Sequence, residues 1–141
     1  MTVISKVLVG LVALAHIYFC YIEMFAWETR GPEVFTFLAA DLFPPTAGLA
    51  ANQGLYNLFL AGGLIWSLLI QPQAWHRNVA LYFLICVLAA GLYGALILPT
   101  TLYVQAIPAA LAQTSQVVIR QDKAPQRKHH IPEKPAENIK T

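Results

Sequence analysis

The chain has 141 residues, of which 57% are hydrophobic and 11% charged, with a formal net charge of +2. Soluble domains are closer to half apolar and a quarter charged, so this composition disfavours a soluble enzyme or a nucleic-acid-binding protein. Residues 1–118 contain seven charged side chains and the last 23 residues contain nine. We therefore expect an apolar body followed by a charged tail.

Four segments are long and apolar enough to cross a membrane, which takes about 20 residues for a hydrocarbon core of about 30 Å. They cover about residues 4–27, 50–70, 78–98 and 100–119. The second ends before Pro72 and the third at Pro99, because proline does not continue a helix. The sequence predicts an all-α integral membrane bundle of four transmembrane helices in residues 1–119.

Two further segments lie outside these helices. Residues 28–49 form an apolar connection that contains Pro44-Pro45, and we expect it to lie in the membrane interface or to fold over the helix ends. Residues 120–141 carry mixed charges and three prolines. Such a segment has too few apolar groups to offset the entropy of ordering, so we expect a disordered basic tail.

The basic residues predict the orientation. Lys6, Arg77 and the six basic residues of the tail fall on one side of a four-span chain, and Arg30 falls on the other. Because lysine and arginine favour the cytoplasmic side, both termini are predicted to be cytoplasmic. The expected location is the plasma membrane, as a multi-pass protein.

The first predicted helix carries Lys6 at its start and two ionisable residues in its interior, His16 and Glu23. Ionisable groups inside a membrane usually face the interior of the protein and are often functional. At 100° per residue, His16, Cys20, Glu23 and Trp27 fall on one face. His16 and Glu23 are about 10 Å apart along the axis, so they do not contact each other directly.

Polar residues of the other three helices fall near the depth of Glu23. Counting from the outer end of each segment places Asn57, Tyr93 and Gln105 within about one helical turn of that depth, and Gln53 nearer the outer surface. His16 lies about two turns deeper. The sequence therefore predicts a polar pocket in the outer half of the protein.

No metal site or cofactor is predicted. His16, Cys20 and Glu23 are suitable ligand types, but one helix spreads them over about 10 Å. The chain also lacks a Cys-x-x-Cys motif.

Strings in all four predicted helices resemble an uncharacterised membrane family, domain of unknown function 1304. The matching stretches are Ala15-His16, Tyr21 to Phe25 with Trp27, Ala51 to Asn57, Phe59 to Ala61, Leu64 to Trp66, Ala90 to Ala95, and Val104 to Ala109. The family pattern falls on His16, Glu23, Asn57, Tyr93 and Gln105. The Pro44-Pro45 loop and the tail after Ile119 depart from it. The resemblance implies a fold and a site and no reaction.

Three functions are compatible with these features. The first is a site that binds, and in one version converts, a small hydrophobic or amphipathic molecule. His16 and Glu23 would act as acid and base there, and Gln53, Asn57, Tyr93, Gln105 and Trp27 would contact the ligand. The second is an oligomeric small-molecule or proton-coupled transporter. The third is a structural or assembly protein. The expected partners are membrane lipid, a small hydrophobic ligand and further copies of the chain, with no nucleic acid.

Overall fold

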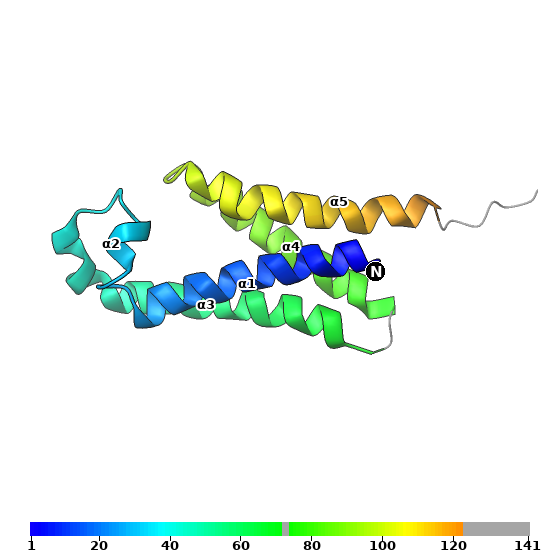
Figure 1. The fold of residues 1–141 in the computed structure, drawn as a ribbon, viewed down its shortest axis with the longest axis horizontal. Coiled ribbons are helices and arrows are strands. Elements are labelled where there is room, and N and C mark those ends of the chain that lie inside the picture. The colour runs from blue at the N-terminus through cyan, green and yellow to red at the C-terminus, as the bar shows by residue number, and fades with distance from the viewer. Residues whose placement is uncertain (72–73, 123–141) are drawn as a thin grey trace, which may run out of the picture.

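The computed structural model describes residues 1–71 and 74–122, and every regular element in these ranges is helical (Figure 1). In chain order the elements are α1 (Val3–Phe25), α2 (Gly31–Val34), the 3₁₀ helix η1 (Ala40–Leu42), α3 (Phe43–Leu69), α4 (Ala74–Gly94), the π-helical η2 (Leu102–Ala106) and α5 (Ile107–Asp122). The all-α class predicted from the sequence is confirmed.

The four long helices lie side by side. Helix α1 packs against α3 and α5, and α4 packs against the same two helices. The N-terminus, the end of α3, the start of α4 and the last turns of α5 lie at one end, called here the N-terminal end (Figure 1). Helix α2 and the connection between α4 and η2 lie at the opposite end, called here the α2 end. Successive long helices therefore run in opposite directions.

Helix α1 presents one continuous buried face. Thr2 caps its first turn by accepting a hydrogen bond from the Ser5 amide at 3.2 Å. The buried side chains recur every three or four residues, as a helix with one packed face requires: Val9, Val12, Ala13, His16, Cys20 and Glu23. The helix ends at Phe25, so Trp27 lies in the following turn and not on the helical stripe that the sequence predicted.

Helix α3 begins at Phe43, whereas the sequence indicated a start near Ala50. Pro44 and Pro45 occupy its first turn, where a missing amide hydrogen costs no helical hydrogen bond and the fixed φ suits a helix. The two prolines therefore start α3 and do not belong to an open loop. The connection from α1 is correspondingly shorter and contains α2 and η1.

The fourth predicted helix consists of two parts. It starts with η2, and α5 follows directly with Pro108 in its first turn. Proline at this position has no amide hydrogen to donate to the Val104 carbonyl, and wider π-helical turns often accompany such interruptions. Helix α5 continues to Asp122. The predicted disordered tail otherwise falls in residues 123–141, outside the described residues.

The packed core lies toward the N-terminal end. All four long helices contribute fully or almost fully buried residues to it: Val9, Val12, Ala13, Leu64, Ala80, Leu84, Val87, Ala109 and Ala112. Gly63 of α3 contacts the ring of Phe83 so closely that a Cβ atom at Gly63 would overlap it. Small residues at such positions let helices approach closely.

Two helices are long and apolar enough to span a membrane, namely Val3–Phe25 and Trp75–Gly94. Helix α3 is interrupted by polar residues, and α5 alone has 16 residues. Large apolar side chains are nevertheless exposed along all four long helices, among them Leu11, Leu49, Phe59, Tyr82 and Leu111. Continuous apolar surface of this kind is typical of a protein that contacts lipid or a partner.

Candidate functional site

A buried hydrogen bond joins Glu23 of α1 to Asn57 of α3. The amide Nδ2 of Asn57 donates to Glu23 Oε2 at 2.7 Å, and the two residues are 7% and 5% exposed. Gly54, one turn before Asn57, makes this approach feasible. A Cβ atom at Gly54 would lie 2.6 Å from Met24 Cγ and 3.1 Å from Glu23 Cβ. The sequence predicted that Glu23 and Asn57 lie at similar depths, and the structure places them in contact.

A cavity of about 650 Å³ opens beside this pair toward the α2 end. Its polar lining includes Glu23, Gln53, Asn57, Tyr93 and Gln105, from α1, α3, α4 and η2. Its other walls are mainly apolar, among them Phe19, Phe35, Leu60, Ile97 and Val104. A volume of this size is within the range of sites for small organic molecules. Five of the seven residues that the sequence singled out thus surround one cavity.

These polar residues are not equally deep. Glu23 and Asn57 are buried and Gln105 is half-buried, whereas Gln53 is exposed and Tyr93 is 71% exposed. Gln53 and Tyr93 therefore lie where the cavity meets the surface. The buried carboxyl group and amide lie at its inner wall.

Close packing of η2 on α4 fixes the position of Gln105. A Cβ atom at Gly91 would lie 2.8 Å from the Ala106 amide nitrogen and 3.0 Å from Gln105 Cβ. Any side chain larger than that of glycine at residue 91 would push the π-helical turn away from α4. Gly91 therefore lets η2 pack directly on α4, which keeps Gln105 and Tyr93 at the same cavity.

A second cavity next to Glu23, of about 330 Å³, has several aromatic side chains in its lining. Trp27, Phe35 and Phe37 line it, together with Glu23 and Gln53. The ring centroids of Trp27 and Phe35 are 5.1 Å apart, and those of Phe35 and Phe37 are 6.2 Å apart. Trp27 Nε1 donates to Thr46 Oγ1 at 3.1 Å, which fixes the indole. The sequence grouped Trp27 with Glu23, and the structure places both around this cavity.

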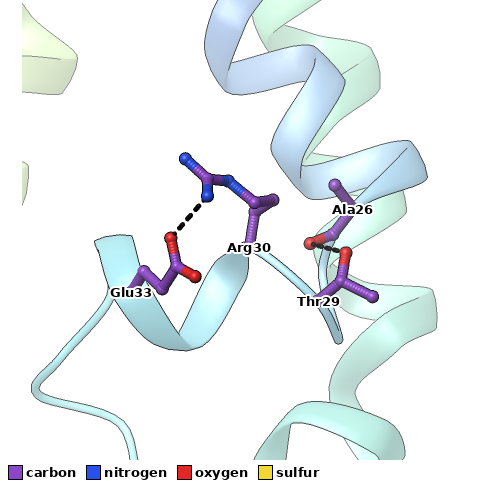
Figure 2. A network of polar contacts seen from close by, with 4 residues as sticks. All are labelled: Ala26, Thr29, Arg30 and Glu33. Atoms are coloured by element: carbon purple, nitrogen blue, oxygen red, sulfur yellow. Dashed lines mark hydrogen bonds and ion pairs between the residues drawn. The ribbon is translucent and has the colours of Figure 1, made fainter.

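The turn after α1 brings charged residues to the α2 end (Figure 2). The Ala26 carbonyl accepts hydrogen bonds from the amides of Arg30 and Gly31 at 2.8 and 3.1 Å. Arg30 then forms an ion pair with Glu33, with 2.8 Å between Nη1 and Oε2 (Figure 2). Glu28 lines a third cavity, of about 370 Å³, which Glu23 also lines. Glu23 thus borders three cavities.

His16 lies apart from this site. It is completely buried and does not line any of the three cavities. Its Nδ1 is 2.9 Å from the Val12 carbonyl, which assigns the ring proton to Nδ1. Its Nε2 has no hydrogen-bond partner within the described residues. The structure therefore does not bring the two acid–base candidates together.

Sequence reasoning missed several lining residues. Phe35 and Val34 come from α2 and its C-cap, and Thr100 and Thr101 come from the connection before η2. The aromatic content of residues 35–43 was the available signal, because those rings need an apolar partner. Within residues 1–71 and 74–122, no cluster of three His, Cys, Asp or Glu side chains is arranged to hold a metal ion.

These features define an all-α protein with four long antiparallel helices and, near one end, a largely apolar cavity that contains a few polar side chains. Residues 10–117 match the family model described as "Protein of unknown function (DUF1304)", so the chain belongs to that family. The resemblance found in the sequence is confirmed. No curated protein and no solved structure gives a significant match.

Proposed function

We propose that the chain is a multi-pass membrane protein in which α1, α3, α4 and the continuous η2–α5 segment all cross the bilayer. The 23 residues of α1 extend about 35 Å, which exceeds the hydrocarbon thickness of about 30 Å. Apolar side chains on the outward faces of all four helices support the proposal. Lys6 and Arg77 lie near the N-terminal end, which supports a cytoplasmic position for that end.

Within this arrangement, the cavity of about 650 Å³ binds a small hydrophobic or amphipathic molecule. The observation that supports this function is the combination of largely apolar walls with a few convergent polar groups from four elements. Exposed Gln53 would contact the polar part of the ligand near the membrane surface, and Tyr93 would contact the part of the ligand that occupies this cavity. Buried Glu23 and Asn57 would fix its orientation. The separation of His16 from Glu23 favours binding over acid–base conversion by that pair.

Neighbouring alanines of α4 provide a matched test. Ala90 lines the cavity, whereas its neighbour Ala89 is exposed and is not part of the cavity lining. We expect Ala90→Phe to fill the cavity and to remove small molecules that copurify with the protein, as measured by native mass spectrometry. Ala89→Phe adds the same bulk outside and is expected to retain them. Equal ligand content in the two variants would contradict a ligand in this cavity.

The Glu23–Asn57 hydrogen bond also supports a purely structural alternative, in which the polar cluster holds the helices together. Glu23→Gln distinguishes the two functions. Glutamine keeps an acceptor for Asn57 but removes the charge. The binding function predicts a folded variant with altered ligand content. The structural function predicts that ligand retention and the yield of folded protein fall together in every Glu23 variant.

A further inference from the structure

We propose that the ligand carries a positively charged ammonium group, which lies between the Glu23 carboxylate and the aromatic side chains of Trp27 and Phe35. This inference rests on the proposed function and specifies the chemical class of the ligand. Three independent features of the α2 end support it.

The first feature is the incomplete pairing of Glu23. Asn57 bonds to Oε2, and no hydrogen bond within residues 1–71 and 74–122 involves Oε1. Among the residues that the structure describes, no lysine, arginine or histidine lines any of the three cavities that Glu23 borders. Oε1 is accessible from the adjoining space, and a carboxylate attracts a cation more strongly where water is largely excluded, as it is around the 7% exposed Glu23. A cationic ligand would provide the missing counter-charge.

The second feature is the aromatic wall next to the carboxylate. Trp27, Phe35 and Phe37 line the cavity of about 330 Å³ together with Glu23. The faces of such rings attract cations, and cages of aromatic residues are a common means of binding ammonium groups. Phe35 also lines the larger cavity, so the same ring borders both spaces. The head group would lie against the rings while the apolar part occupies the larger cavity.

The third feature is the charge at the α2 end. Residues 26–42 contain Glu28, Glu33 and Asp41 and one basic residue, Arg30, which pairs with Glu33. Glu28 lines the cavity of about 370 Å³ that leads to Glu23. An excess of acidic residues around a site concentrates cations there and repels anions.

Three probes with the same ten-carbon chain test the proposal: decyltrimethylammonium, 1-decanol and decyl sulfate. Their affinities are measured by calorimetry with the full chain in nanodiscs of digalactosyldiacylglycerol, an uncharged lipid without an ammonium group, with Ala90→Phe as the reference for nonspecific partitioning. We expect the cation to bind at least tenfold more tightly than the alcohol, and the sulfate to bind most weakly. If decanol binds as tightly as the cation and Ala90→Phe abolishes both, the ammonium preference is wrong while the binding function stands. If Ala90→Phe changes no affinity, the binding function itself is wrong.

Two variants test which side chains cause the preference for the cation over the alcohol. Glu23→Gln is expected to equalise the affinities for the cation and the alcohol. Phe35→Leu keeps an apolar side chain and is expected to weaken cation binding severalfold while decanol binding changes little. Phe59→Leu, at an exposed aromatic residue that lines none of the three cavities, is the control and should behave as wild type. An unchanged cation preference in both Glu23→Gln and Phe35→Leu would overturn the proposal.

Discussion

Asn57 donates a hydrogen bond to Glu23 across the contact between α1 and α3, and both side chains are buried. This bond links the two helices near the α2 end, whereas the apolar core links all four helices near the N-terminal end. The contact between α1 and α3 therefore includes a buried polar bond near the α2 end, whereas the core near the N-terminal end is formed by apolar side chains. Substitutions in the two halves should have different consequences.

Removal of the Asn57 amide leaves the Glu23 carboxyl group without its partner. We expect Asn57→Ala to lower the free energy of unfolding by about 1.5–3 kcal/mol, the usual range for a hydrogen bond to a charged group. Denaturant unfolding in detergent micelles measures the change. The control is Asn52→Ala in the same helix, where the side chain is exposed and a loss below about 0.5 kcal/mol is expected. Equal losses of unfolding free energy in the two variants would show that the Asn57–Glu23 hydrogen bond contributes nothing to stability.

A methyl group at residue 54 should separate α3 from α1. Gly54→Ala places a Cβ atom 3.2 Å from the Cys20 carbonyl oxygen and closer still to Met24. Since overpacking typically costs about 1–3 kcal/mol, we expect a loss of stability in that range. At Gly48, also in α3, a Cβ atom would meet nothing within 4 Å. Gly48→Ala should therefore have little effect or a slight gain, and a comparable loss there would contradict the steric explanation.

Gly62 and Gly63 are neighbours with opposite surroundings. A Cβ atom at Gly63 would overlap the Phe83 ring, whereas one at Gly62 would meet nothing within 4 Å. We expect Gly63→Ala to lower the melting temperature and Gly62→Ala to leave it unchanged or raise it. The double variant Gly63→Ala/Phe83→Leu makes room for the methyl group and should lose less than the two single losses added together. Simple additivity would rule out the contact as the cause.

His16 is a buried imidazole whose Nε2 has no partner in the described structure. An unsatisfied buried polar atom typically costs about 1–3 kcal/mol. Replacement with leucine removes that atom and keeps a similar volume, so His16→Leu is expected to be at least as stable as wild type in thermal unfolding. A clear loss of stability would mean that Nε2 has a partner in the folded protein, such as a bound water molecule.

The proposed orientation is tested by cysteine labelling in sealed membrane vesicles, with Cys20 and Cys86 replaced by alanine. Glu33→Cys lies at the α2 end and Gln71→Cys at the N-terminal end, and both positions are exposed. We expect a membrane-impermeant maleimide to label the two positions from opposite sides, with Gln71→Cys accessible from the cytoplasmic side. Labelling of both from the same side would contradict the four-span arrangement.

The sequence predicted well what depends on helical geometry alone. The spacing of His16, Cys20 and Glu23 predicts one face, and all three are buried on α1. Depth counting grouped Glu23 with Asn57 and Gln105, and the structure places these residues around one cavity. Neither inference requires knowledge of loops, because residues on packed antiparallel helices keep their depth.

What could not be predicted depends on contacts between segments. Pro44 is equally compatible with a loop and with the first turn of a helix, so the early start of α3 was missed. Phe35 becomes part of the cavity because α2 folds back toward the helices, which Gly31 permits by lying against the Phe43 ring. His16 lies apart from the cavities because of the way α1 packs against α3 and α5, and the sequence of α1 alone gives no sign of it.

The π-helical turn in η2 changes the phase of the fourth long helix. Before and within it, Thr101 and Gln105 border the large cavity; from its last residue onward, Ala106, Ala109 and Ala112 are buried. A π turn adds one residue to the helical repeat, which rotates everything that follows by about 100° relative to an uninterrupted α-helix. One helix can thus use one register for the cavity and another for the packed interior. The inserted residue separates the surface that is free to adapt to a ligand from the surface that must stay matched to its neighbours.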